Sequence, residues 1–255
     1  FMHYELFHIG PLTIYTYGFL IAVGILAAYY VTELRAKKLG VSIGKLDVLT
    51  VWILVGGFAC SKILYWITRL PDILKDPSIM LNFGDGWVVY GGIIGGLLAG
   101  IYYCKKENLD FLELADLILP QVALAQGFGR LGCFFAGCCY GQPTTAWYGI
   151  TFPSGSLAPA GVPLVPTQLL SSFFDFGMFF LLCWMAGREK PKGEVTAWYL
   201  IIYSAGRFAI EFFRGDLVRG QVGAFSTSQL ISIFVMFAGL IMLWLCKRGG
   251  NDKMA

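Results

Sequence analysis

Charged residues are scarce in this chain, and their scarcity excludes one broad class of protein. Asp, Glu, Lys and Arg account for 14% of the 255 residues, whereas 57% are hydrophobic and the mean hydropathy is +0.67. A soluble globular domain carries roughly 25% charged residues, so an ordinary soluble domain is excluded. The net charge of +3 is small and spread over loops, which predicts no binding to nucleic acid.

Histidine is almost absent. His3 and His8 both stand near the N-terminus, so no histidine is expected to act as a general base in the apolar part of the chain. Seven cysteines occur, but Cys133, Cys138 and Cys139 form no CxxC pair. Zinc binding is therefore the least favoured interpretation of these three. A disulfide and a single reactive thiol are the alternatives, and we expect no metal and no cofactor.

Long apolar runs dominate what is present. Each run has about the ~20 residues that an α-helix needs to cross a hydrocarbon core ~30 Å thick. The runs are Leu12–Val31, Asp47–Ile67, Trp87–Cys104, Leu112–Gly132, Thr167–Ala186, Val195–Phe213 and Phe225–Cys246. The sequence therefore predicts an all-α membrane protein in which residues 1–255 form a single bundle domain of seven transmembrane helices.

The basic residues of the loops predict the orientation of this bundle. With seven spans, twelve Lys and Arg residues fall on one side of the membrane and four on the other. The cytoplasmic side of a membrane protein carries the excess of Lys and Arg. The N-terminus is therefore expected outside the cell and the C-terminus in the cytoplasm.

Residues 142–166, between the fourth and fifth runs, differ from the rest of the chain. This segment contains five prolines and no Lys, Arg, Asp or Glu. Proline at this density is incompatible with a helix, so short strands and turns are expected. We interpret the segment as a small outer-surface arm or cap, and a plain connector is the alternative.

Three basic residues, Lys62, Arg130 and Arg207, lie within the apolar runs. A cation at membrane depth costs at least ~2.5–3.5 kcal/mol, so it usually faces a polar cavity or an anionic partner. The predicted orientation places all three in the outer half of the membrane, at the depth of Tyr17 and Tyr90. Structural ion pairs would explain each cation alone, but their common depth favours a shared site that faces the outer leaflet.

The most specific stretch is residues 127–141, in which five glycines surround Arg130. We expect these glycines to break the fourth helix and to expose backbone N–H groups to a ligand. Arginine offers a planar fork that matches phosphate bidentately. At the outer membrane face, the available phosphate belongs to a phospholipid.

A second group follows on the sixth run, where Arg207, Glu211 and Arg214 share one helix face by their spacing of four and three. An intrahelical ion pair between Arg207 and Glu211 is expected in any case. Arg207 would still have other donors for a phosphate.

Small residues recur at spacings of four in the third run. They are Gly91, Gly92, Gly95, Gly96 and Gly100. This pattern indicates close helix packing, and such packing would determine where the neighbouring Tyr90 points.

These residues together resemble the bacterial prolipoprotein diacylglyceryl transferase family. The resemblance rests first on Gly129-Arg130-Leu131-Gly132, Gly137, Gly141, Arg207, Glu211, Arg214 and Asp216. Supporting pieces occur in the same order: Tyr17-Gly18, Gly91-Gly92, Pro166-Thr167-Gln168-Leu169, and Ser226 with Gln229.

Such enzymes move the diacylglyceryl group of phosphatidylglycerol to the lipobox cysteine of a prolipoprotein signal peptide and release glycerol-1-phosphate. The resemblance implies a multi-pass transferase of the bacterial inner (plasma) membrane, with membrane lipid and the precursor as partners. The expected catalytic residues are Arg130, Arg207, Tyr90 and Glu211. The expected substrate-binding residues are Tyr17, Lys62, Gly91, Gly92, Gly129, Cys133, Gly137, Gly141, Gln168 and Arg214.

The chain departs from the family pattern at positions that bear on chemistry. Tyr90 and Val165 stand where the family has His, Cys133 where it has Asn, and Ser171 where it has Glu. A tyrosine with a pKa of ~10 is a poor base unless a nearby cation lowers that pKa. Either nearby cations activate the acceptor thiol, or this homologue uses another acceptor.

A non-catalytic or transport-type membrane protein is the alternative from a different class. Transport favours charged groups through the full membrane depth and helix breaks near the midplane. Here the cations cluster in the outer half of the membrane, which favours the transferase over a transporter. The same observation does not distinguish the transferase from an inactive relative.

Overall fold

The computed structural model is mostly helical and describes residues 5–9, 12–81, 86–216, 221–222 and 225–251. Its helices are α1 (Thr16–Leu39), α2 (Ile43–Thr68), α3 (Leu70–Ile73), the 3₁₀ helix η1 (Pro77–Leu81), α4 (Val89–Lys106), α5 (Phe111–Ala136), α6 (Thr167–Ala186), α7 (Glu194–Glu211) and α8 (Thr227–Asn251). Three two-stranded antiparallel sheets pair β1 (Glu5–Ile9) with β2 (Leu12–Tyr15), β3 (Ile150–Thr151) with β4 (Pro163–Leu164), and β5 (Gln221–Val222) with β6 (Phe225–Ser226).

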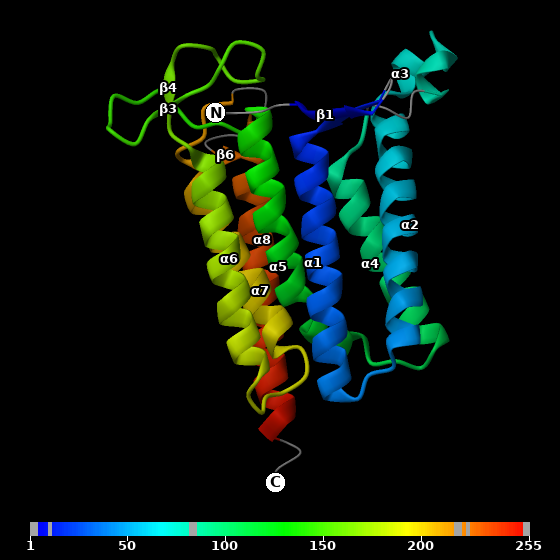
Figure 1. Cartoon of the computed structure of the whole chain (residues 1–255). Helices are drawn as coiled ribbons and strands as arrows, with labels where there is room; N and C mark the ends of the chain where they lie inside the picture. Colours follow the sequence, from blue (N-terminus) through cyan, green and yellow to red (C-terminus); the bar gives the residue numbers. More distant parts are fainter. Residues whose placement is uncertain (1–4, 10–11, 82–85, 217–220, 223–224, 252–255) are drawn as a thin grey trace. The chain divides into compact units, whose positions relative to one another are not determined.

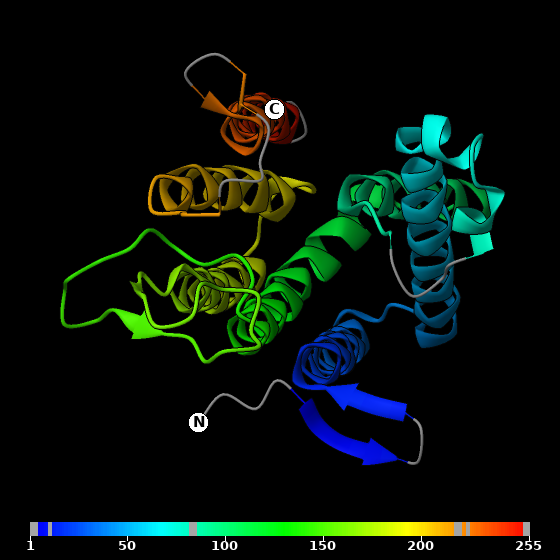
Figure 2. The same ribbon diagram turned by 90° about the horizontal axis from the view of Figure 1, so that it is seen from above.

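The chain divides into two compact units. The first comprises Phe1–Leu34 and Ala115–Ala255, and the second comprises Arg35–Leu114. Within the first unit, α6, α7 and α8 lie side by side in chain order (Figure 2). The segment with β3 and β4 lies at the same end of this unit as β6, and the C-terminal end of α8 lies at the other (Figure 1). The single bundle domain expected over residues 1–255 stays a prediction.

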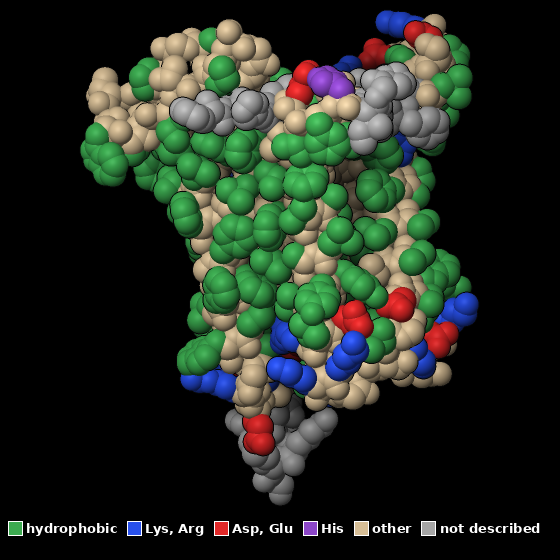
Figure 3. Space-filling view, viewed as in Figure 1, with side chains coloured by type: hydrophobic (Ala, Val, Ile, Leu, Met, Phe, Trp, Pro, Cys, Tyr) green, Lys and Arg blue, Asp and Glu red, His purple; other side chains and the backbone are tan. Residues whose placement is uncertain are grey.

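Five helices are long and apolar enough to cross a membrane: α1, α2, α5, α6 and α8. In the space-filling view, hydrophobic side chains cover the helices between their ends (Figure 3). The other two expected spans, α4 and α7, are helices of 18 residues, but α4 ends in two lysines and α7 contains Arg207 and two glutamates. The all-α, multi-pass membrane character is thus supported, while the seven-span layout and its orientation stay predictions.

The first apolar run begins differently from the prediction. Leu12–Tyr15 is strand β2, and the helix begins at Thr16. The strand pairs with β1, where His8 lies opposite Thr13 and the His8 Nδ1 and Thr13 Oγ1 atoms are 3.0 Å apart. A segment rich in β-branched and aromatic residues favours a strand when a partner strand is adjacent.

The helix break predicted within residues 127–141 comes late in that stretch, because α5 continues past Gly127 and Gly132 to Ala136. Its glycines make room for neighbouring side chains instead. A Cβ at Gly127 would lie 2.6 Å from the Phe176 ring of α6, and one at Gly132 would lie 3.1 Å from the Tyr17 ring of α1. Ala136 is the last residue of the helix, and the next residue, Gly137, has a φ of +70°, which favours glycine.

The glycines of α4 pack closely against a neighbouring helix as their spacing indicated, and that neighbour is α2. A Cβ at Gly91 would lie 2.5 Å from the Cys60 carbonyl oxygen, and one at Gly95 would collide with the Gly56 backbone. At Gly92 a Cβ would reach only ordinary van der Waals distance from α2. Close packing of the second unit therefore depends on some of these glycines more than on others.

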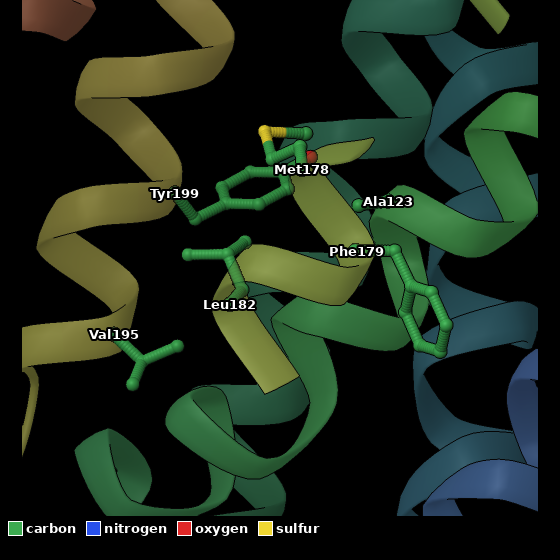
Figure 4. Close-up of a cluster of buried hydrophobic side chains, with 6 residues drawn as sticks. All are labelled: Ala123, Met178, Phe179, Leu182, Val195 and Tyr199. Carbon is green, nitrogen blue, oxygen red and sulfur yellow. The ribbon is translucent and has the colours of Figure 1, made fainter. Parts of the chain in front are cut away.

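The core of the first unit lies where α5, α6 and α7 meet. Its buried side chains are Ala123, Met178, Phe179, Leu182, Val195 and Tyr199. Figure 4 shows Tyr199 and Val195 of α7 facing Met178 and Leu182 of α6, while the Phe179 ring points to the other side of α6. Because lipid is as apolar as these side chains, packing and interhelical hydrogen bonds contribute more than the hydrophobic effect in a membrane. One such bond joins the Ser172 hydroxyl to the Gly127 carbonyl oxygen at 2.9 Å, and the Tyr199 hydroxyl donates another to Gln126 at 3.0 Å.

Asp116 of α5 caps the first turn of α7. Its carboxylate accepts hydrogen bonds from the Gly193 N–H at 2.8 Å, the Thr196 N–H at 2.7 Å and the Thr196 hydroxyl at 2.7 Å. Asp116 is buried, so water would not satisfy the Gly193 and Thr196 donors if the carboxylate were removed. The contact determines where α7 begins relative to α5, and it therefore helps to position Arg207.

We therefore predict that Asp116→Ala lowers the free energy of unfolding by roughly 2–4 kcal/mol, since several buried donors lose a charged acceptor. Unfolding in mixed detergent micelles measures the change. Glu113→Ala is the control on the same helix, because Glu113 is exposed. Equal stability of the two variants would contradict the capping role.

Candidate functional site

Arg130 and Cys133 lie on the last turns of α5, three residues apart and hence on one helix face. The chain then turns back on itself, because Gly137 and Cys139 both have positive φ, +70° and +59°. This turn brings Cys138 and Cys139 to Cys133, so that the three Sγ atoms all lie within 4.8 Å of one another. We call these three residues the thiol cluster.

The loop after α5 is held by the start of α6. The Thr167 hydroxyl donates to the Cys139 carbonyl oxygen, and the Gln168 side-chain amide donates to that of Cys138, both at 2.9 Å. Thr167 and Gln168 are each 1% exposed. Gln168, expected to bind substrate, therefore also positions the backbone of the thiol cluster.

Gly141 lies where three segments of backbone cross. Its N–H donates to the Val165 carbonyl oxygen at 3.0 Å, and the next N–H, of Gln142, donates to Phe213 at 2.9 Å. A Cβ at Gly141 would lie 2.5 Å from the Val165 carbonyl oxygen and 2.8 Å from that of Phe213. Only glycine fits this crossing without displacing the backbone.

Arg214 connects the segment after α7 to the thiol cluster. Its guanidinium binds the Asp216 carboxylate with two hydrogen bonds, of 2.9 and 2.7 Å, and it also contacts the Cys139 thiol. Burial opposes the charge of Arg214, but the hydrogen bonds to Asp216 and the negative charges of Cys139 and Asp216 raise its pKa. Hydrogen bonds from Cys133 and Cys138, and then the charge of Arg214, lower the pKa of Cys139. Cys139 is therefore the thiol most readily ionised outside the helix.

Arg130 differs from the other arginines of the site. Among the residues that the structure describes, its guanidinium makes no hydrogen bond and no ion pair, and its electrostatic neighbours are Tyr203, Cys133, Cys139 and Asp175. Asp175 of α6 is 3% exposed and balances part of the charge from a distance. The donors of Arg130 are thus available to a ligand.

Arg207 lies in a network that joins α7 to α8. Its Nη1 is 2.6 Å from Glu211 Oε2, which confirms the predicted ion pair, and its Nη2 donates to the Ser228 hydroxyl at 3.0 Å. The Ser226 hydroxyl donates to Glu211 Oε1 at 3.0 Å. Arg207 is 14% and Glu211 6% exposed by side chain, so these contacts hold the guanidinium in a defined orientation in a largely buried place.

Ser226 and Gln229 form a reciprocal cap at the start of α8. The Gln229 N–H donates to the Ser226 hydroxyl at 3.1 Å, and the Ser226 N–H donates to Gln229 Oε1 at 3.0 Å. This is a capping box, and it holds the hydroxyl that contacts Glu211. The Ser-x-x-Gln spacing could have been recognised from the sequence as a helix start.

Two contacts were missed by the sequence analysis. Tyr203 is an electrostatic neighbour of Arg130 and precedes Arg207 by four residues, so it shares the α7 face of Arg207. Ser228 supplies the second hydrogen bond to Arg207. The spacing Tyr203-x3-Arg207-x3-Glu211 contained the first signal, whereas nothing local to Ser228 indicates its partner.

Tyr17 opens α1 beside this region. Its ring packs against Gly132, and it lines a cavity of about 530 Å³ together with Cys138, Ala136 and Leu157. The cavity therefore borders the thiol cluster. A Cβ at Gly129 would meet no atom within 4 Å, so packing among the described residues does not require glycine at that position.

Lys62, Tyr90, Gly91 and Gly92 belong to the second unit. Lys62 is 4% exposed, and its ammonium lies 5.0 Å from the centre of the Tyr65 ring and 5.2 Å from that of Trp87. Cation–π contacts thus stabilise a charge that the sequence placed in the membrane. Tyr90 is 45% exposed. The predicted position of these residues beside Arg130 stays a prediction.

Comparison with known proteins identifies relatives along nearly the whole chain. Residues 4–245 match the family model described as prolipoprotein diacylglyceryl transferase. The chain is 48% identical over 254 residues to phosphatidylglycerol--prolipoprotein diacylglyceryl transferase 2 of Clostridium perfringens, covering 99% of this chain and 98% of that protein. It is 45% identical over 237 residues to the corresponding transferase of Clostridium tetani, covering 93% and 95% of the two chains. The protein therefore belongs to the prolipoprotein diacylglyceryl transferase family.

Proposed function

We propose that this protein transfers the diacylglyceryl group of phosphatidylglycerol to the lipobox cysteine of a prolipoprotein. The observation that carries the proposal is the family match across residues 4–245, with relatives 45–48% identical. In the reaction, the acceptor sulfur forms a bond to the glyceryl carbon while the bond from that carbon to the phosphate oxygen breaks. The thiol loses its proton, and glycerol-1-phosphate leaves with the bonding electrons.

The arginines suit this chemistry because negative charge grows on the departing phosphate. Arg130 has no protein partner among the described residues and offers its full fork of donors. Arg207 is oriented by Glu211 and Ser228 and contributes a positive charge held in one orientation. Donors positioned before the reaction stabilise the transition state without reorganisation.

The acceptor must lose a proton without help from a histidine. The thiolate is the nucleophile in such reactions, and a nearby cation favours it over the thiol. Arg130 is one source of positive charge, and Tyr90 stands where the family has histidine. We assign Tyr90 the role of hydrogen-bond partner or base, with Tyr17, Lys62, Gly91 and Gly92 lining the lipid site.

The remaining assignments follow the roles of the family. Glu211 orients Arg207, Arg214 holds the loop, Gly141 shapes the loop, and Gly129 and Gly137 let the backbone approach the lipid. Cys133 and Gln168 complete the substrate side of the site. The contacts of Gly141 and Gln168 with the loop after α5 support these roles.

We place the site at the outer leaflet of the bacterial inner membrane, in a bundle of seven spans with the N-terminus outside. The distribution of Lys and Arg among the loops supports this orientation. Trp147 is 95% and Tyr148 48% exposed in the segment 142–166. Such rings favour the lipid headgroup region, which supports an arm lying on the outer surface.

A purified sample should convert a lipobox peptide to its diacylglyceryl thioether when phosphatidylglycerol is the only lipid donor, without added metal or nucleotide. Mass spectrometry measures the mass that the diacylglyceryl group adds to the peptide. A peptide with Ser in place of the acceptor Cys is the control, because its hydroxyl is a much weaker nucleophile. Transfer to a different acceptor alone would reject the lipoprotein assignment, and no transfer to any acceptor would favour a non-catalytic relative.

Arg130→Ala and Arg207→Ala should each lower kcat by roughly 10²–10³-fold, the usual effect of losing one electrostatic donor. The lysine variants should recover little of this, since an ammonium lacks the bidentate fork. Turnover at saturating lipid is the measurement. Arg188→Ala, on a loop at the other end of the helices, is the matched control, and near-normal turnover of Arg207→Ala would make that residue structural.

Tyr90→Phe removes only the hydroxyl oxygen, so it should keep the fold and lower turnover by roughly 10²–10⁴-fold if the hydroxyl donates or accepts a proton. Tyr102→Phe, also exposed and on the same helix, should have little effect. We expect Cys133→Ala to be less damaging than Tyr90→Phe. A fully active Tyr90→Phe enzyme would show that nearby cations alone activate the acceptor.

A further inference from the structure

The thiol cluster has no role in the proposed reaction that requires three sulfurs. Cys133, Cys138 and Cys139 are half-buried and form no disulfide, and their Sγ atoms lie within 4.8 Å of one another. The other four cysteines of the chain are not part of this group. Gathering three thiols at one point therefore needs a separate explanation.

The backbone is shaped to hold these sulfurs together. The Cys138 N–H donates to the Cys133 carbonyl oxygen at 3.1 Å, and Cys139 has a φ of +59°. A non-glycine residue in this region costs roughly 1–3 kcal/mol and persists only where its surroundings impose it. Here the hydrogen bonds from Thr167 and Gln168 to the two carbonyl groups impose it.

The spacing of the sulfurs suits one metal ion. Zinc binds thiolates at about 2.3 Å with tetrahedral geometry, which separates two sulfurs on the same ion by about 3.8 Å. Three sulfurs within 4.8 Å need only small side-chain rotations to reach that arrangement. A disulfide would join two of them and leave the third without a role.

The charges around the thiol cluster also favour a bound metal ion. Three thiolates and a divalent ion carry a net charge of −1, which is expensive to bury alone. The Arg214 guanidinium contacts the Cys139 thiol, and Arg130 is an electrostatic neighbour of Cys133 and Cys139. Two positive groups next to the cluster thus compensate the thiolates and the negative complex that they form.

We propose that Cys133, Cys138 and Cys139 form a three-thiolate site for a divalent cation of the zinc class. Three protein ligands leave a fourth tetrahedral position for water or another small ligand, as in zinc sites that are not purely structural. Thr167 and Gln168 are the positioning residues of this site, because they orient the backbone that carries two of the ligands. The proposal is independent of the transferase activity, since its test measures metal binding.

The test titrates the full-length protein in detergent, under reducing and oxygen-free conditions, with Co²⁺ and then with Zn²⁺. We expect about one equivalent of Co²⁺ to produce a thiolate-to-cobalt charge-transfer band, and Zn²⁺ to remove that band. Loss of an outer-shell partner alone weakens metal binding by 10–100-fold. Cys133→Ser, Cys138→Ser and Cys139→Ser should each therefore weaken Zn²⁺ binding by more than about 100-fold.

Cys246→Ser is the matched control, because Cys246 is also half-buried but lies on α8, outside the cluster. It should bind both metals as the wild type does. Circular dichroism checks that each variant keeps its helical content. The wild-type titration tests the proposal even if a variant fails to fold. The proposal is overturned if the wild type gives no charge-transfer band, or if the cluster variants bind metal like Cys246→Ser. A zinc-free protein with a disulfide within the cluster would overturn it as well.

Discussion

The backbone crossing at Gly141 is the contact on which the rest of the site depends. There the segment after α5 is hydrogen-bonded to Val165, just before α6, and to Phe213, just after α7. A side chain at this point would collide with both carbonyl oxygens. The three segments that meet carry Cys139, Gln168 and Arg214, so one close approach of backbones positions the thiols, their supporting amide and a neighbouring cation.

The arginines around this crossing differ in their hydrogen-bond and ion-pair partners. Arg214 is bound to Asp216, and Arg207 to Glu211 and Ser228, whereas Arg130 has only longer-range neighbours among the described residues. In a site of low polarity, a paired charge is held in one orientation and an unpaired one is strongly attracted to an anion. The arrangement therefore combines a fixed cation with an available one, which suits capture of a phosphate group and stabilisation of the charge that develops as it leaves.

Local features of the site were predictable where neighbours in sequence are neighbours in space. The ion pair of Arg207 with Glu211 follows from helical spacing, and the packing of Gly91 against α2 follows from the glycine pattern. The helix break predicted within residues 127–141 falls only after Ala136, so Gly127 and Gly132 do not break the helix. Gly127 leaves room for the ring of Phe176, and Gly132 leaves room for that of Tyr17. Neither aromatic residue is adjacent to its glycine in the sequence.

The sequence by itself determined the membrane-spanning character, through long apolar runs, and membership of the transferase family, through motifs of arginine and glycine. Both are properties of short stretches, so they need no knowledge of the fold. The tertiary structure alone decided that three cysteines without metal-binding spacing share one point, that Ser228 completes the Arg207 network, and that Arg130 lacks a partner among the described residues. These contacts depend on the turn at Gly137 and on helices packed from distant parts of the chain, and no local pattern encodes the distance between such groups.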